Sequence, residues 1–184
     1  MEAIIKRKLS REEYHRMAEA DIFAPDERIE LINGEIIQMS PIGNKHLGVV
    51  SRITALLVPR LLGKYNVHTQ SPVKIGQYSE PEPDLMVTPY RDDYYASTGI
   101  YPEDVLLLIE VSDTTLRKDI QIKLPLYAQA AIPEVWIIDL KDDVIRQYTN
   151  IQNNQYRQEN SFTRNEQIAA TQLSLTVKGS DLVG

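Results

Sequence analysis

The sequence predicts one α/β (α+β) domain, residues 1–184, in which helices flank a mixed β-sheet. The most apolar run of the chain, 105–111, is interrupted only by Glu110, which is typical of a central strand buried on both faces. A stretch with helical periodicity, 116–131, follows it, and a second apolar run, 134–139, comes next. This order predicts two central strands joined by a helix that packs on the sheet.

The N-terminal part predicts a helix and a hairpin. Ser10 and Glu13 have the spacing of a capping box, which predicts a short helix that ends before Pro25. The dipeptide Asn33-Gly34 lies between two apolar-rich runs. Because both central residues of a tight hairpin turn need positive φ, Asn-Gly in this setting is a strong hairpin signal.

A longer amphipathic helix and two strands follow. Apolar residues recur at spacings of three and four over 44–62, where Pro59 should kink or end the helix and Gly63 marks its stop. Apolar and polar residues alternate over 67–75, which predicts a half-exposed strand. A short strand is predicted at 84–88, directly after a proline.

The C-terminal part is predicted to be rich in β-structure. Residues 144–149 and 155–159 have the pattern of a polar hairpin, and 173–177 that of a last edge strand. We therefore expect a core of about 10–150 and a C-terminal β-strand extension, 151–184.

Composition excludes several classes of protein. Hydrophobic residues make up 42% and charged residues 25%, as in soluble globular proteins. No run of 18 apolar residues exists, so a membrane span is not expected, and the N-terminus lacks the apolar core of a secretory signal. The absence of Cys removes disulfides and cysteine-held metals, and three His leave little for a zinc site. The expected compartment is the cytoplasm.

The net charge of −6 argues against a general electrostatic grip on nucleic acid. Residues 80–113 hold nine acids and one base, Arg91, which indicates either a solvated acidic face or a site for a cation. Candidate phosphate contacts lie outside this block: Lys6, Arg7, Lys8, Arg11, Lys45, Arg52 and Lys74.

Two acids are candidates for a metal site. An ionised Glu110 inside an apolar strand is costly to bury without a partner, unless it ends the strand and reaches solvent or an Arg. Asp84 begins the short strand after Pro83. If the two strands are neighbours, their carboxylates come within reach of one divalent cation such as Mg²⁺.

The helix over 116–131 offers a cation. Asp119, Lys123 and Tyr127 are spaced i, i+4, i+8 and share one face. Lys123 is either an exposed lysine paired with Asp119, or a cation that orients a water or stabilises charge on a phosphate. Tyr127 and Trp136 are expected in the core.

These residues together resemble the PD-(D/E)XK restriction-endonuclease-like superfamily, whose motif matches Pro83-Asp84 and Glu110-Val111-Ser112. The superfamily normally has a lysine where this chain has Ser112. Several of its branches move the lysine to the following helix, where Lys123 lies. The chain is also similar to a bacterial branch of predicted endonucleases long catalogued as a domain of unknown function. The similarity covers about 10–150 and rests on these segments in order: Glu30–Glu35, Met39-Ser-Pro41, His46, Glu82-Pro-Asp84, Ile109–Ser112, Asp119 with Lys123 and Tyr127, and Pro133–Asp139.

The resemblance implies a metal-dependent endonuclease that hydrolyses DNA. Asp84, Glu110 and the Val111 carbonyl would hold Mg²⁺ or Mn²⁺, and Lys123 would serve the reacting phosphate. Glu30, in the hairpin, is a candidate to complete the acid cluster. His46 is either a capping or packing residue or a contact of the site, and Glu82 is expected to be an exposed acid.

Two other functions remain open. A catalytically inactive descendant could keep the fold as a protein-interaction or regulatory module, which Ser112 and the acidic charge favour. Glycoside hydrolysis by paired acids is the second, but no aromatic sugar platform supports it. We expect a homodimer, with the edge strands of the tail as its interface, because two protomers could embrace a DNA duplex.

Overall fold

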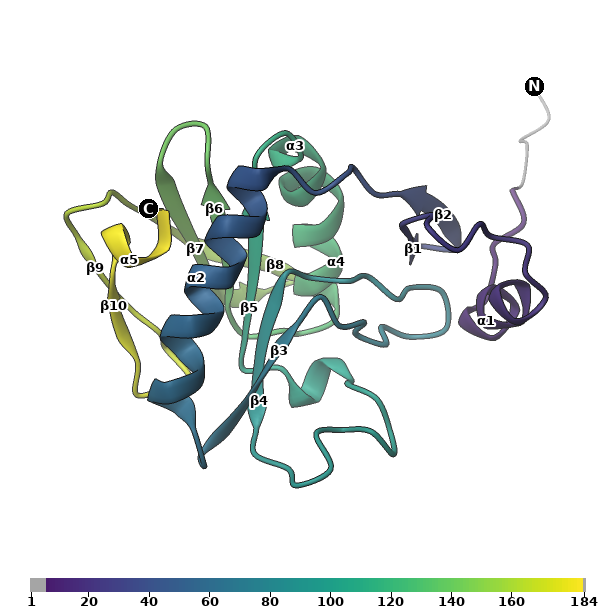
Figure 1. Cartoon of the computed structure of the whole chain (residues 1–184), viewed down its shortest axis with the longest axis horizontal. Helices are drawn as coiled ribbons and strands as arrows, with labels where there is room; N and C mark the ends of the chain where they lie inside the picture. Colours follow the sequence, from purple (N-terminus) through teal and green to yellow (C-terminus); the bar gives the residue numbers. More distant parts are fainter. Residues whose placement is uncertain (1–5, 184) are drawn as a thin grey trace.

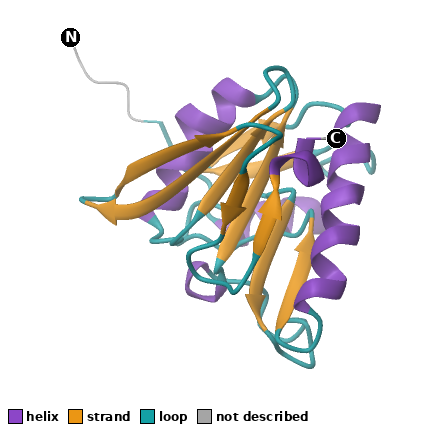
Figure 2. Cartoon of the chain, turned by 90° about the vertical axis from the view of Figure 1, so that its left-hand side faces the viewer, coloured by secondary structure: helices purple, strands orange, loops and turns teal. Residues whose placement is uncertain are grey.

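The computed structural model describes residues 6–183, in which a main sheet of six strands has helices on both sides (Figures 1 and 2). Its strands, in spatial order, are β3 (Tyr65–Thr69), β4 (Leu85–Pro89), β5 (Leu107–Ser112), β6 (Val135–Asp139), β7 (Val144–Gln152) and β8 (Gln155–Phe162). Strands β5 and β6 are parallel and the other neighbours are antiparallel. The predicted mixed sheet is confirmed.

The remaining elements surround this sheet. Two small sheets consist of β1 (Ile29–Ile32) with β2 (Glu35–Gln38), and of β9 (Gln167–Ala169) with β10 (Thr176–Lys178). The helical elements are α1 (Arg11–Glu19), α2 (Asn44–Leu61), the 3₁₀ turn η1 (Pro102–Asp104), α3 (Leu116–Lys118), the π-helical segment η2 (Asp119–Lys123), α4 (Leu124–Gln129) and α5 (Gly179–Val183).

Strand β5 lies inside the sheet, and all six of its residues are buried, as the apolar run predicts. The chain leaves β5, passes through α3, η2 and α4, and returns as β6, because a parallel partner needs a crossover connection. The predicted strand–helix–strand order is therefore confirmed, and the crossover helix follows directly on the end of β5 that carries Glu110.

Two apolar clusters cover the two faces of the sheet. Ile109, Trp136 and other side chains of one face pack against α2, α5 and the β9–β10 pair. Leu108 and Ile137 belong to the opposite face, which packs against α4 and the loops that precede β4 and β5. Alternate residues of β5 thus enter different clusters, as the period of a strand requires.

The N-terminal hairpin has the predicted turn. Asn33 and Gly34 have φ of 53° and 82°, and Ile32 pairs with Glu35 across the turn. The amide of Glu80 donates to the carbonyl of Leu31 at 2.7 Å, and this bond helps to fix the hairpin beside the main sheet. The capping box of α1 is also present, with Ser10 and Glu13 bonded to each other's backbone amides.

Several element boundaries differ from the prediction. The strand predicted at 67–75 ends at Thr69, because Gln70 takes a φ of 45° and Pro72 follows. Pro59 lies inside α2, which continues to Leu61. The first acid, Asp84, lies just before β4 rather than within it.

The tail also differs from the prediction. The strand predicted at 173–177 is wrong in position: β10 begins at Thr176 and pairs with β9. Leu173 and Leu175 instead contribute side chains to the cluster over α2. In the described part of the chain, every helix is too short or too polar to cross a lipid bilayer.

Candidate active site

Asp84 and Glu110 meet at one end of the sheet. Strands β4 and β5 are antiparallel neighbours, with Leu85 opposite Ile109, so the start of β4 lies beside the end of β5. The Oδ2 atom of Asp84 accepts a hydrogen bond of 2.9 Å from the amide of Val111. The strands that carry or adjoin Asp84 and Glu110 are therefore neighbours, as a shared site for both acids requires.

The backbone of Val111 faces Asp84. The amide of Leu108 donates to Glu134 of the β6 segment at 3.0 Å, and the carbonyl of Ser112 accepts from Leu140 at 2.9 Å. Backbone groups alternate in direction along a strand, so those of Val111 face the opposite edge. Its amide bonds Asp84 there, and its carbonyl lies on the same edge.

Glu110 is almost fully buried, with 3% of its surface exposed, and its carboxylate has two close partners. Lys123 Nζ donates to Oε1 at 3.1 Å, and the hydroxyl of Tyr127 donates to the same atom at 2.5 Å. The alternative in which Glu110 ends the strand and reaches solvent or an Arg is wrong. Both bonds use Oε1, and Glu110 is one of the residues that line a pocket at this end of the sheet.

Lys123 is buried between two carboxylates. Its Nζ lies 3.1 Å from Glu110 Oε1 and 3.2 Å from Glu30 Oε2, and 3% of the residue is exposed. The alternative of an exposed lysine paired with Asp119 is therefore wrong. Burial alone would lower the pKa of Lys123, but the carboxylates of Glu110 and Glu30 outweigh burial and raise this pKa. Lys123 consequently keeps its positive charge.

Glu30 connects the hairpin to this pair. It is fully buried in β1, and it forms a second ion pair of 2.6 Å with Lys118. Its Oε2 also accepts a hydrogen bond of 3.2 Å from the amide of Glu82. Glu30 thus contacts Lys123 as a second carboxylate beside Glu110, which agrees with the supporting acid suggested from the sequence. Glu82 is not the fully exposed acid that the sequence predicts, since burial raises the pKa of its half-buried carboxyl.

Ser112 occupies the position where the superfamily motif has its lysine. The Oγ of Ser112 donates to Asp119 Oδ2 at 2.7 Å, and Thr115 donates to the same oxygen at 2.8 Å. Burial raises the pKa of Asp119 despite these bonds and the nearby Lys123. Ser112 and Thr115 hold the first turn of the crossover helix against the end of β5.

The π-helical segment η2 carries Asp119 and Lys123. Pro125, near the start of α4, has no N–H to donate to the carbonyl of Gln121, so the α-helical bonding pattern is interrupted here. Lys123 is the last residue of η2, and Tyr127 lies about one turn further on, in α4. Both side chains reach the same oxygen of Glu110.

His46 is a contact of the site rather than a capping residue. Its Nε2 lies 3.0 Å from Asp84 Oδ2, and Gly43, not His46, is the N-cap of α2. The hydrogen bond with Asp84 raises the pKa of His46 against the opposing effect of burial.

Burial is the main influence on Glu110. It raises the pKa of Glu110 to about 8, although Lys123 and the Tyr127 hydroxyl favour the ionised form. Burial and the Glu110 carboxylate together raise the pKa of Tyr127 well above its usual value. Tyr127 is therefore a hydrogen-bond donor at neutral pH, as well as the core residue that the sequence predicts.

These side chains surround a cavity of about 220 Å³, named here the active-site pocket. Its polar lining consists of acids, cations and hydroxyls: Glu82, Asp84, Glu110, Asp113, Asp119, Arg28, His46, Lys118, Lys123, Ser40, Thr114 and Thr115. Arg28 and Lys118 are not predicted from the sequence, because neither has a distinctive pattern around it. Only the fold brings them to the pocket.

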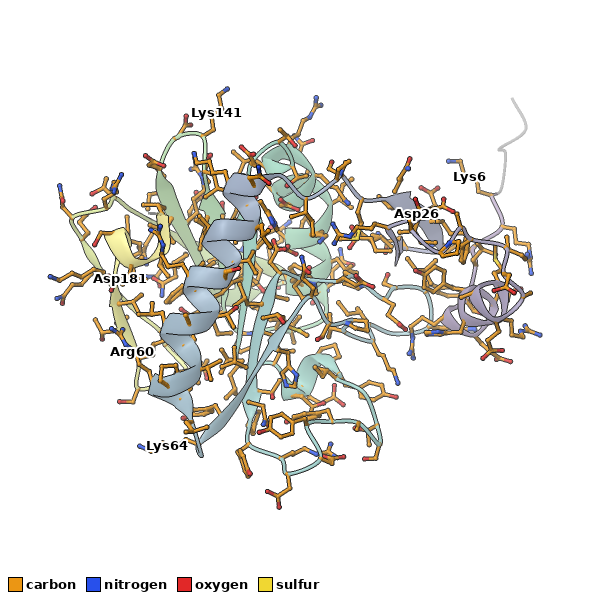
Figure 3. The ribbon with its side chains drawn as sticks, in the orientation of Figure 1. Lys6, Asp26, Arg60, Lys64, Lys141 and Asp181 are labelled. Atoms are coloured by element: carbon orange, nitrogen blue, oxygen red, sulfur yellow. The ribbon has the colours of Figure 1, made fainter. Side chains whose placement is uncertain are left out.

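Most of the predicted phosphate contacts have partners elsewhere. Lys6 pairs with Glu35, Arg7 with Glu13 and Arg11 with Glu80. Lys45 donates to the carbonyl of Leu140, and Lys74 donates to that of Thr98. Labelled charged side chains such as Lys64 and Lys141 lie at the periphery of the molecule (Figure 3).

The donor atoms of the pocket fit a divalent metal ion. Carboxylate and carbonyl oxygens are the ligands that Mg²⁺ prefers, usually one or two carboxylates with water and substrate oxygens. Asp84, Glu110 and the Val111 carbonyl supply such oxygens at one edge of β5. Within residues 6–183 no group of three or more His, Cys, Asp or Glu is placed to hold a metal.

The mixed sheet and the placement of its acids and lysine define a restriction-endonuclease-like fold. The chain belongs to the Uma2 family, described as "Putative restriction endonuclease", whose model matches residues 11–178. It is similar in structure to a putative nuclease belonging to DUF820 from Anabaena variabilis ATCC 29413, with a TM-score of 0.71 and 16% sequence identity over 95% of this chain and 97% of that chain. No curated protein matches the chain. The resemblance inferred from the sequence is confirmed.

Proposed function

We propose that this protein is a metal-dependent endonuclease that hydrolyses phosphodiester bonds in DNA. The family description supports a nuclease, and one observation carries the proposal: a buried, charged Lys123 lies beside Glu110 in the same pocket as Asp84. Buried charges of this kind in a pocket are characteristic of functional sites.

Each residue has a distinct role in this proposal. Asp84, Glu110 and the Val111 carbonyl would hold Mg²⁺ or Mn²⁺. The ion, when bound, lowers the pKa of a coordinated water and neutralises charge on the phosphate. Lys123 presents a fixed positive charge to the phosphate as its negative charge increases, or orients the attacking water.

Other residues keep these groups in place. Glu30 Oε2 forms an ion pair of 3.2 Å with Lys123 Nζ, and the hydroxyl of Tyr127 donates a hydrogen bond to Oε1 of Glu110. Ser112 and Asp119 attach the crossover helix to β5 at the position where the superfamily normally has a lysine. Lys123 thus takes the place of that lysine from the following helix, which favours an enzyme over an inactive module.

Cleavage of supercoiled, linear and single-stranded DNA with Mg²⁺ or Mn²⁺ tests the proposal. Wild type should cut DNA only when metal is present. The cleavage rate should fall at least about 100-fold in each of the variants Asp84→Asn, Glu110→Gln and Lys123→Ala. Lys64→Ala, which removes an exposed charge, is the matched control and should cut normally. Circular dichroism establishes that each variant is folded.

Two outcomes contradict the proposal. Cutting that survives in all three site variants would place the activity elsewhere. No cutting of any substrate, with no Mn²⁺ binding by calorimetry, would favour a non-catalytic interaction module. The homodimer stays a prediction, which light scattering of the purified protein checks.

A further inference from the structure

The active-site pocket continues into a second cavity beside the β1–β2 hairpin. This outer hollow has a volume of about 780 Å³ and is lined by Ala24, Asp26, Glu27, Arg28, Gln38 and 39–42. The two cavities share Arg28 and the segment 39–42. Asp26, at the hairpin, marks the side of the molecule on which the outer hollow lies (Figure 3).

Arg28 differs from the lysines of these two cavities. Lys118 lies 2.6 Å from Glu30, and Lys123 lies between Glu30 and Glu110. Among the described residues, no carboxylate lies within 4.0 Å of the guanidinium of Arg28, whose one hydrogen bond is a 3.4 Å contact with the carbonyl of Ser40. A partly exposed guanidinium with free donors is well suited to bind a phosphate.

The rest of the outer hollow suits a base rather than a second phosphate. Met39, Pro41 and Ile42 contribute apolar surface, and Ile42 is 38% exposed. Asp26 and Glu27 would repel a phosphate there. The flat face of a base loses water when it packs on such apolar surface, which is favourable.

We propose that Arg28 binds the phosphate next to the scissile one, and that the base of that nucleotide lies unpaired in the outer hollow. This inference rests on the proposed function and specifies its substrate. A base can enter the hollow only after it leaves its stack and its partner, which costs a few kcal/mol in a duplex. The preferred substrate is therefore single-stranded DNA, or a duplex with an unpaired stretch at the cleavage point.

Steady-state cleavage and fluorescence anisotropy of a labelled single-stranded oligonucleotide test this inference. Arg28→Ala should raise KM and weaken binding at least about tenfold, with kcat changed by less than about twofold. The slope of log affinity against log salt should fall by about 1. Arg28→Lys should restore part of the affinity, and Ile42→Glu should weaken binding without a change in the arginine.

Control and substrate comparisons complete the test. Lys64→Ala removes one positive charge at the opposite end of α2 from the active-site pocket (Figure 3) and should bind as wild type does. Wild type should bind the single strand more tightly than the matched blunt duplex.

The outcomes for this inference and for the proposed function can be separated. Cleavage by wild type with an unchanged KM and salt slope in Arg28→Ala would overturn the inference alone, as would tighter binding of the blunt duplex. Binding that depends on Arg28 without any cleavage would overturn the nuclease, and would support only the part of the inference in which Arg28 contacts a phosphate of single-stranded DNA. If wild type neither binds nor cuts the oligonucleotide, both are wrong.

Discussion

Lys123 Nζ lies 3.1 Å from Glu110 Oε1, although the two residues are thirteen positions apart in the sequence. This ion pair joins the crossover helix to the central strand, and both partners are almost fully buried. Glu30 extends the pair to the hairpin, so three elements meet at one lysine. Stability and activity are therefore expected to depend on the same residue.

Removal of Lys123 should destabilise the fold. Lys123→Met leaves the carboxylates of Glu110 and Glu30 without their shared cation, and loss of one partner of a buried pair costs about 3–5 kcal/mol. Urea unfolding at pH 8 measures this loss, with Lys64→Ala as a control that should stay within about 0.5 kcal/mol. A cost for Lys123→Met below about 1 kcal/mol would show that the pair is unimportant for stability.

Removal of the Tyr127 hydroxyl should change both stability and ionisation. Tyr127→Phe deletes the 2.5 Å hydrogen bond to Glu110, which favours the ionised carboxylate. The pKa of Glu110 should rise further, and the free energy of unfolding should fall by about 1–3 kcal/mol. Carboxyl NMR titration and urea unfolding measure these effects. Tyr148→Phe, which loses a half-buried bond to Glu159, is the control and should leave the pKa of Glu110 unchanged. A fall in that pKa in Tyr127→Phe would refute the assigned role.

The pH dependence of stability should report on Glu110. Its pKa is about 8 in the folded protein against an ordinary 4.5, so the folded state binds the proton more tightly. This contribution is fully present below pH 4.5 and is lost as the pH rises toward 8. In EDTA, the unfolding free energy of wild type relative to Glu110→Gln should fall by at most about 1.4 kcal/mol per pH unit. Parallel curves for the two proteins would exclude the raised pKa.

A second buried carboxylate, Glu134, attaches the C-terminal segment around Thr171 to the main sheet. Its Oε1 accepts hydrogen bonds of 2.7 Å from Trp136 and Gln147, and its Oε2 accepts two of 2.6 Å from the amide and hydroxyl of Thr171. Glu134→Gln places an amide donor among these donors, so one or more bonds must break. Hydrogen exchange at the amide of Thr171 should accelerate in this variant, while exchange around Glu110 stays as in wild type. Unaltered protection of Thr171 would show that Glu134 does not hold the segment.

Local patterns predicted the parts of the site that depend on neighbouring residues. Asn33-Gly34 specifies the hairpin turn by itself, and one polar residue in the run 105–111 identifies Glu110. The spacing of Lys123 and Tyr127 places both on one helix face, and the structure has them on one oxygen of Glu110. Each of these predictions needed only the residues of one turn, strand or helix.

The remaining contacts depend on packing between distant segments. The ion pair of Glu30 with Lys118 and the contact of His46 with Asp84 join elements whose relative placement no local pattern specifies. Arg28 lines the pocket just before the hairpin, and the hairpin is held by backbone bonds to the distant residues Tyr78 and Glu80. The strand predicted at 67–75 was too long because alternation continues past Gln70, where the backbone turns.

The most direct test of the metal site is anomalous diffraction from crystals grown with Mn²⁺. We expect one strong peak about 2.1 Å from a carboxylate oxygen of Asp84, from one of Glu110 and from the Val111 carbonyl. In Glu110→Gln crystals the peak should disappear while the fold is retained. A peak elsewhere, or none at saturating Mn²⁺ in the wild type, would contradict the central claim that Asp84, Glu110 and the Val111 carbonyl bind one metal ion.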